Sequence, residues 1–413
     1  MDRRRFLGAG ACVVGAGAVP LSTAWGRTGP AASVQGTPRD LFPRLSREIH
    51  LIAAGGTPLG SFAEAGLDAY RDYWRMGTDE GRAWFGEMVL DVRARSAHLL
   101  GAGADEIALV HCTKAGEQIV LDGLPALREG GNIVTNDLHF SGSLHNLVGL
   151  ARQGLDVRIV RARDWRVDPA DMVAAMDGGT ALVAISLVSN INGHMEAVRT
   201  LADAVHARGG YLYADLIQAA GVVPVDVRAM GIDFAACNGY KWLFGVHGAG
   251  FLYVRRELQG MALSDRLFPG HVRANYPPWT DDPEPAAGSY SYAPPTDATR
   301  YQPGHLAYIA YSALREGLRF IDGLGVEAVR DHSVGLARRL LDRVDLERYP
   351  TLSRDPLQAP IVAFRVPDAP RLAGALREAG VVVSLSASEM RVSPAIYNTE
   401  ADIDTLAEVM ARA

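Results

Sequence analysis

The sequence predicts an α/β fold in which helices cover both faces of a mostly parallel sheet. Two observations lead to this fold class. From about Ile107 onward, short runs rich in β-branched residues alternate with longer stretches of helical periodicity. Most of these short runs are continuously apolar, which is typical of parallel strands buried on both faces. Strands that alternate with helices in this way form one sheet with crossover helices on either side.

The elements of this large domain, which we place at residues 61–300, follow one another in a regular order. Strands are expected at residues 107–110, 132–135, 157–160, 181–186, 211–214 and 234–237. Helices are expected at residues 116–127, 142–152 and 197–208, the last closed by Gly209-Gly210. An N-terminal segment at residues 25–60 precedes the domain.

A smaller α+β domain is expected at residues 301–413. Residues 271–299 lack periodicity and are rich in Pro, Gly, Ser, Tyr and Asp, so we expect a long ordered loop there. The elements expected after it are a helix at residues 306–324, strands at 361–366 and 380–385, and a final helix at 400–412. Loops of such length within compact proteins are often functional.

The composition limits the classes of protein to which the chain can belong. Its 41 basic and 47 acidic side chains are spread without blocks, so neither a nucleic-acid surface nor a polybasic membrane surface is expected. The cysteines, Cys12, Cys112 and Cys237, have no CxxC spacing and no accompanying histidine pattern, so no metal site is expected. We expect Cys112 and Cys237 to be buried free thiols, with a disulfide between them as the alternative.

The first 24 residues have the pattern of an export signal. A charged start precedes a short run of Gly, Ala and Val and then small residues up to Ala24. Arg3-Arg4, followed by Phe6-Leu7, resembles a twin-arginine signal, and the run is too short and glycine-rich for a membrane span. We therefore expect a signal peptide and export of the folded protein to the periplasm or beyond. A fortuitous basic amino terminus is the alternative.

Polar residues follow two neighbouring strands of the expected sheet. Asp215 ends the strand at residues 211–214, Gln218 lies three residues further on, and Lys241 follows the next strand after a short turn. Ligands of open parallel sheets bind outside the carboxyl ends of the strands, so these side chains are expected to converge. Taken singly, Asp215 could be a helix cap and Lys241 a surface residue.

An Asp-x-x-Gln motif, a lysine after the next strand and a glycine-rich return at residues 245–250 together resemble the class V aminotransferase family of fold-type-I pyridoxal-phosphate enzymes. The likeness runs from about Ile49 to the carboxyl terminus and is densest from Ser189 to Tyr253. The family includes cysteine desulfurases, kynureninase and isopenicillin N epimerase. The resemblance implies pyridoxal 5'-phosphate as the cofactor and the fold-type-I architecture, with a large cofactor-binding domain and a smaller C-terminal one.

The resemblance also implies roles for the residues that carry it. Lys241 is expected to form a Schiff base with the cofactor aldehyde and then to move the substrate α-proton as a base. Asp215 is expected to face the pyridine nitrogen and keep it protonated, which makes the ring an electron sink. Gln218 is expected to donate a hydrogen bond to the ring hydroxyl oxygen. Asn190 is expected to contact the same oxygen or the substrate carboxylate.

The expected phosphate contacts match the family less closely. Thr113 matches the turn that cradles the phosphate at a helix start. Lys114 departs from the family pattern, so only its backbone amide is expected to serve. Asn238 and Tyr240 stand where relatives often hold Ser and His against the phosphate.

Three further features complete the expected site. His139 aligns with the ring that stacks on the cofactor, although it and the nearby His145 could each be ordinary histidines. Arg391 matches the arginine that grips the substrate carboxylate, which suits a guanidinium because its fork gives two parallel hydrogen bonds. The run from Arg300 to Gly304 resembles the segment that relatives contribute to the neighbouring subunit, which implies a homodimer with shared active sites.

The reaction is less closely defined than the cofactor. Cysteine desulfurases need a nucleophilic cysteine shortly before the substrate arginine, and residues 381–390 contain none, so that activity is disfavoured. The remaining reactions at Cα are transamination, epimerisation and β/γ-elimination, on an amino acid or on an aminoacyl side chain of a peptide. The pattern is most similar to the isopenicillin-N-epimerase-like branch, and we favour a transaminase-type tailoring enzyme. A cofactor-binding module without turnover is the alternative outside enzymes.

Overall fold

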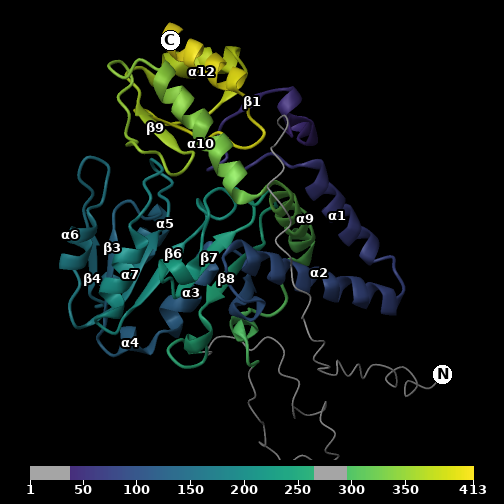
Figure 1. Ribbon diagram of the computed structural model, residues 1–413, viewed down its shortest axis with the longest axis vertical. Helices are drawn as coiled ribbons and strands as arrows, with labels where there is room; N and C mark the ends of the chain where they lie inside the picture. The colour runs from purple at the N-terminus through teal and green to yellow at the C-terminus, as the bar shows by residue number, and fades with distance from the viewer. Residues whose placement is uncertain (1–37, 265–294) are drawn as a thin grey trace, which may run out of the picture. The chain divides into compact units, whose positions relative to one another are not determined.

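The computed structural model describes residues 38–264 and 295–413 (Figure 1). The expected export signal, and most of the loop expected at residues 271–299, lie outside the described residues. Within the described part of the chain, no helix is long and apolar enough to cross a membrane.

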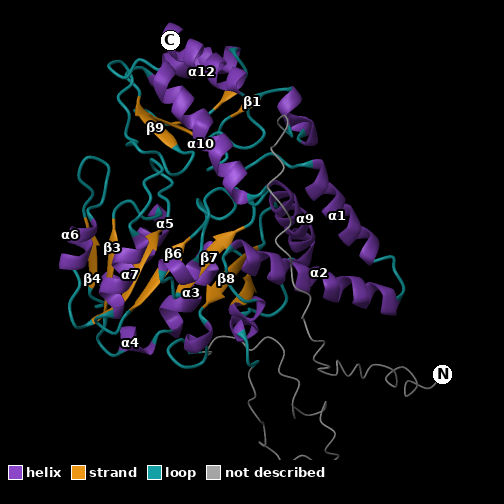
Figure 2. Cartoon of the chain, in the orientation of Figure 1, coloured by secondary structure: helices purple, strands orange, loops and turns teal. Residues whose placement is uncertain are grey.

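A seven-stranded sheet with the order β2-β8-β7-β6-β5-β3-β4 carries the candidate site (Figure 2). Its strands are β2 (Ile107–Val110), β3 (Asn132–Asn136), β4 (Val157–Val160), β5 (Thr180–Ser186), β6 (Tyr211–Asp215), β7 (Phe234–Asn238) and β8 (Gly250–Val254). Only β8 runs against the other strands of this sheet. The predicted mostly parallel sheet is therefore confirmed, while the sequence pattern does not predict the antiparallel strand β8.

Helices cover both faces of this sheet. The helices of this part of the chain are α1 (Ser61–Tyr73), α2 (Thr78–Leu99), α3 (Thr113–Gly123), α4 (Pro125–Arg128), α5 (Ser141–Arg152), α6 (Pro169–Ala174), α7 (Val198–His206), α8 (Val227–Met230) and α9 (Tyr308–Leu324), of which α1 packs on α9. Ile107 and Leu109 of β2 belong to the same apolar cluster as residues of α7 and α9, whereas Ala108 and Val110 belong to the cluster that contains residues of α3 and α5. The helix predicted at residues 116–127 is two helices, because Pro125 begins α4 and cannot donate a backbone hydrogen bond to continue α3.

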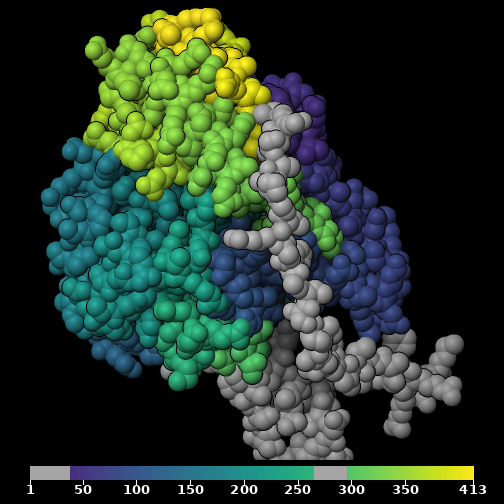
Figure 3. Space-filling model, viewed as in Figure 1, coloured from purple at the N-terminus to yellow at the C-terminus, as the bar shows by residue number. Residues whose placement is uncertain are grey.

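The C-terminal part of the chain forms two smaller sheets and its own apolar cluster. Its elements are α10 (Val326–Arg343), β9 (Val362–Arg365), α11 (Ala369–Glu378), β10 (Val381–Val382), β11 (Ser384–Leu385), β12 (Glu389–Val392) and α12 (Glu400–Arg412). Strand β1 (Ile49–His50) comes from the other end of the chain and pairs in parallel with β10. Figure 3 shows the C-terminal residues, in green and yellow, in contact with the teal residues. One hydrogen bond between these two parts of the chain runs from Ser353 Oγ to Asn192 O, at 2.6 Å. The domain boundaries at residues 60 and 300 stay predictions.

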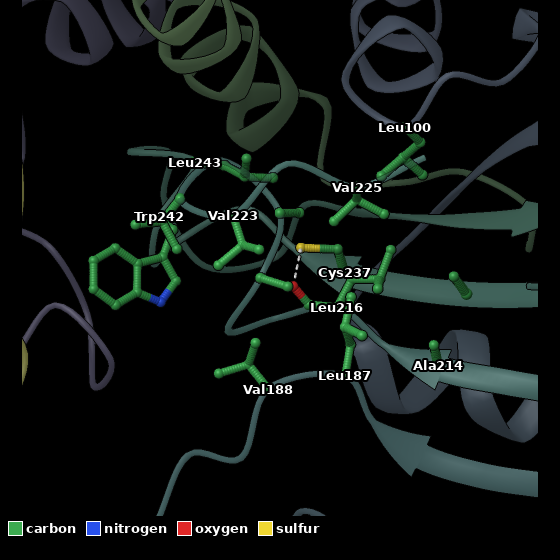
Figure 4. Close-up of a cluster of buried hydrophobic side chains, with 14 of the residues drawn as sticks. Leu100, Leu187, Val188, Ala214, Leu216, Val223, Val225, Cys237, Trp242 and Leu243 are labelled. Atoms are coloured by element: carbon green, nitrogen blue, oxygen red, sulfur yellow. Dashed lines mark hydrogen bonds between the residues drawn. The ribbon is translucent and has the colours of Figure 1, made fainter. Parts of the chain in front are cut away.

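The core behind the site contains one of the two described cysteines. Cys237 is 1% exposed among apolar side chains, and its thiol donates to Leu216 O at 3.8 Å (Figure 4). Cys112 is half-buried at the start of α3, and both thiols are free. The prediction of two free thiols is confirmed, but only Cys237 is fully buried. Cys112 lies at a helix start beside the site, where packing is less complete.

Candidate functional site

The first turn of helix α3 lies at the carboxyl ends of β2 and β7. Gly116 permits this close approach, since a Cβ atom there would lie 2.7 Å from Ala236 Cβ. Thr113, the first residue of the helix, is buried, and its Oγ1 has no hydrogen-bonding partner in the described part of the chain. An unpartnered buried hydroxyl is costly, so this turn is suited to an anion that accepts from Thr113 and from the free helix amides.

Asp215 and Lys241 are both buried where β6 and β7 end. Asp215 Oδ1 accepts a hydrogen bond from Ile217 N at 2.9 Å. Burial raises the pKa of Asp215 to about 6, and the charges of His139 and Lys241 oppose that rise. Burial likewise lowers the pKa of Lys241 to about 8, with the charge of Asp215 opposing and that of Arg391 adding to the fall. An amine with this pKa is a practical base near neutral pH.

The buried amide of Gln218 is partly used within the protein. Its Nε2 donates to Ala54 O at 3.0 Å, and its Oε1 accepts from Trp242 Nε1 at 2.9 Å. Because a primary amide has two N–H groups, one of them remains for an oxygen of a ligand. The orientation of Gln218 is therefore fixed by two elements, the N-terminal segment and the turn after β7.

His139 lies at the centre of a buried polar network. Its Nδ1 lies 2.8 Å from Ser186 Oγ, and its Nε2 lies 3.4 Å from Glu117 Oε1. Lys114 Nζ forms an ion pair with Glu117, so the side chain of Lys114 is held by the protein, and the role of its backbone amide at a phosphate stays a prediction. His145 has no part in this network.

Arg391 of β12 closes the site from the C-terminal part of the chain. Its Nη1 donates to the backbone oxygen of Asn190 at 2.6 Å, and a Cβ at Gly55 would lie 3.8 Å from its Nη2. Its buried Nε has no partner among residues 38–264 and 295–413, and burial lowers the pKa of Arg391. Asn190 thus holds Arg391 through its backbone, whereas the direct contact expected of the Asn190 side chain stays a prediction.

Asn238 and Tyr240 make contacts that do not point to a phosphate. Asn238 Oδ1 accepts from Gly239 N at 3.1 Å, and the ring of Tyr240 stacks on His247 with centroids 4.0 Å apart. The roles expected for them stay predictions. In the part of the chain that the structure describes, no group of three or more His, Cys, Asp and Glu side chains is arranged to hold a metal ion.

Two further parts of this site are not among the residues predicted for it. Residues 54–57 reach it from the N-terminal segment, where Thr57 Oγ1 donates to Lys241 O at 2.9 Å. The pair Gly55-Gly56 is the signal for this segment, but the sequence leaves open whether the pair is a turn or lies at the active site. Glu117 lies four residues after Thr113 on the same helix face, a spacing that could have identified it.

The residues present fit pyridoxal phosphate. The unpartnered hydroxyl and helix start at Thr113 suit its phosphate, Asp215 suits its pyridine nitrogen, and Lys241 suits its aldehyde. The sequence has 41 basic side chains, and the two lysines among them are Lys114 and Lys241, both in this site. Fold and site together define a fold-type-I pyridoxal-phosphate enzyme.

Comparisons with known proteins agree with this class. The family description Aminotransferase class-V matches residues 74–406. The protein named Uncharacterized aminotransferase YcbU of Bacillus subtilis is 27% identical over 371 residues, which cover 88% of this chain and 94% of the relative. A probable cysteine desulfurase of Methanothermobacter thermautotrophicus is 27% identical over 319 residues, 73% of each chain. The apo structure of a cysteine desulfurase from Thermococcus onnurineus NA1 shares the fold with a TM-score of 0.81 at 21% identity, covering 92% of this chain and 99% of that one.

The family match spans most of the chain, and the chain therefore belongs to the class V aminotransferase family. Pyridoxal phosphate is its cofactor, as predicted, and the predicted fold-type-I architecture is confirmed.

Proposed function

We propose that this protein is an exported pyridoxal-phosphate enzyme that transaminates the Cα of an amino acid or of an aminoacyl side chain of a peptide. When bound, the cofactor supplies the electron sink for a carbanion at Cα. Lys241 would hold the cofactor and move the α-proton, and Asp215 would keep the pyridine nitrogen protonated. The relative named as an aminotransferase covers nearly the full length of both chains, which supports this reaction.

One observation carries the choice of an amino-acid substrate. Arg391 is half-buried, with its Nε buried and unpartnered, and no ion pair joins it to a carboxylate in the described part of the chain. Withdrawing a guanidinium from water without an anion is costly, and a substrate carboxylate would supply that anion with two hydrogen bonds. A carboxylate held there would place its Cα next to the Lys241 amine.

Sulfur transfer to an enzyme thiol is not part of the proposal, although several relatives are named as cysteine desulfurases. The segment at residues 381–390, before Arg391, contains no cysteine. Burial raises the pKa of the Cys237 thiol well above its usual value, and a neutral buried thiol is a poor nucleophile.

Three further parts of the proposal rest on sequence features. The Arg3-Arg4 motif supports twin-arginine export to the periplasm, and the motif set supports the isopenicillin-N-epimerase-like branch. The run from Arg300 to Gly304 supports a homodimer with shared active sites. Cell fractionation and light scattering of the mature protein test the location and the dimer. A protein retained in the cytoplasm, or a monomer, would contradict the corresponding part.

The reaction is tested by incubating the cofactor-loaded enzyme with amino acids and a 2-oxo acid acceptor, followed by mass spectrometry. Transamination predicts a new 2-oxo acid together with the amino acid made from the acceptor. Inversion at Cα without an oxo acid would indicate an epimerase, and release of ammonia with loss of a β-substituent would indicate a lyase. A loaded protein without turnover would be a binding module.

The carboxylate site is tested with Arg391→Met, and Arg391→Lys serves as the control that keeps the charge. Loss of about 3 kcal/mol of charge-assisted hydrogen bonding predicts a KM about 100-fold higher for Arg391→Met. An unchanged KM would remove Arg391 from the substrate site.

A further inference from the structure

Glu117 is a buried carboxylate that the expected roles of the site do not use. It is 2% exposed in the second turn of α3. Its Oε2 accepts from Lys114 Nζ and, at 2.9 Å, from Ser143 Oγ. Its Oε1 has no hydrogen-bonding partner in the described part of the chain, and it lies 3.4 Å from His139 Nε2, which is likewise without one.

Glu117 is ionised inside the protein at neutral pH. Burial acts to raise the pKa of Glu117, but the nearby His139 and the ion pair with Lys114 together outweigh burial and hold that pKa below its usual value. A carboxylate can only accept hydrogen bonds. The nitrogen of His139 that faces it must therefore present an N–H group.

The other side of His139 is compatible with that arrangement. Ser186 Oγ lies 2.8 Å from Nδ1 and accepts from Phe140 N at 3.3 Å, so the serine O–H is free to donate to Nδ1. The network then has a donor and an acceptor at each step, with the imidazole proton on Nε2.

We propose that Glu117 is a positioning residue that fixes the proton of His139 on Nε2 and the plane of its ring, while Lys114 balances the charge of Glu117. The inference deepens the proposed function, because His139 is the ring expected to stack on the cofactor. A histidine held between Glu117 and Ser186 can neither flip nor exchange tautomers without breaking both contacts. We therefore expect removal of the negative charge of Glu117 to change the tautomer of His139 while the fold is retained.

Glu117→Gln gives a sharp test of this proposal. Lys114 and Ser143 both donate at the Oε2 position, so the glutamine oxygen is expected there and its NH₂ group then faces His139 Nε2. A donor at that position requires a lone pair on Nε2, so the proton moves to Nδ1. Long-range ¹H–¹⁵N NMR of the cofactor-loaded chain reads the tautomer directly, with His139→Asn used to assign the signal.

Ser143→Ala is the matched control, because it removes a hydrogen bond to the same carboxylate but keeps the charge. The proposal predicts Nε2–H in the wild type and in Ser143→Ala, and Nδ1–H in Glu117→Gln. If Glu117→Gln does not fold, Glu117→Met removes the acceptor, and loss of the Nε2–H pattern is expected there too. An unchanged Nε2–H pattern in a folded variant, or Nδ1–H in the wild type, would overturn the proposal. Failure of the proposed function would instead appear as a cofactor-loaded wild-type chain that makes no 2-oxo acid, whatever the tautomer of His139.

Discussion

The buried charged side chains at the two ends of strands β6 and β7 differ in how many partners the protein supplies. At their amino ends Asp233 is fully buried, accepts from His206 Nε2 at 2.7 Å and from Leu212 N at 2.8 Å, and pairs with Arg255. At their carboxyl ends Asp215 is nearly as buried, but the one hydrogen bond that its side-chain carboxylate accepts from the described residues comes from Ile217 N.

The difference separates structural polar groups from functional ones. A buried charge whose partners all come from the protein stabilises one packing arrangement, whereas a buried charge with few partners costs stability until a ligand completes it. The carboxyl ends gather charged groups of the second kind, Asp215, Lys241 and Arg391 Nε, together with the unpartnered neutral hydroxyl Thr113 Oγ1. This contrast is the physical reason to place the cofactor there.

The largest effect is expected at the amino ends. Asp233→Asn removes the charge that pairs with Arg255, and breaking a buried ion pair costs about 3 to 5 kcal/mol. We expect the lower part of that range, because the Arg255 side chain is 33% exposed and can rehydrate. Denaturant unfolding measures the loss, and the folded variant should still bind the cofactor. A loss of less than about 1 kcal/mol in the free energy of unfolding would contradict the structural role of the Asp233 charge.

Asp215→Asn is expected to act in the opposite direction in the cofactor-free protein. The folded pKa of Asp215 is raised from 3.8 to about 6, a difference of roughly 2 units, or about 3 kcal/mol. The protonated Asp215 carboxyl leaves the full stability of the fold below pH 3.8. Part of that stability is lost as the pH rises through about 6, because the buried carboxyl then ionises. Asparagine does not ionise, so the variant keeps that stability. The variant should therefore be more stable by up to about 3 kcal/mol above pH 6 and equal to the wild type near pH 4.

Unfolding free energies of both proteins from pH 4 to pH 8 check this prediction. Cofactor affinity, measured alongside, should fall in Asp215→Asn, because the pyridine nitrogen loses its carboxylate. A variant less stable than the wild type at pH 8 would show that Asp215 is a structural group like Asp233.

The smallest effect is expected for Thr113→Val. Replacing an unpartnered buried hydroxyl by a methyl group of similar shape should stabilise the cofactor-free protein by about 1 kcal/mol. The same change removes a donor to the phosphate, so cofactor affinity should fall about tenfold. Titration calorimetry and thermal unfolding measure the two changes, and a destabilised protein with normal affinity would contradict the assignment.

The sequence predicts the parts of the fold that local periodicity encodes. The predicted strands at residues 107–110 and 157–160 have the bounds of β2 and β4, and the final helix is α12. Pairings between distant residues leave no local signal. The pairing of β1 with β10 and the reversed direction of β8 depend on packing that no window of sequence contains.

The same limit applies to the site. Asp215, Gln218 and Lys241 could be predicted because they follow strands at characteristic spacing. The contact of Glu117 with His139 and that of Arg391 with Asn190 form only in the folded chain. A lone glutamate on a helix has the same local pattern whether it faces solvent or a buried histidine.

Borohydride reduction followed by peptide mass mapping tests most directly whether Lys241 carries the cofactor. The sequence offers two lysines, so the reduced cofactor can lie on Lys241 or on Lys114. We expect the added mass on the Lys241 peptide, its loss in Lys241→Arg and its retention in Lys114→Arg. Added mass on Lys114, or none on a chain loaded with cofactor, would contradict this expectation.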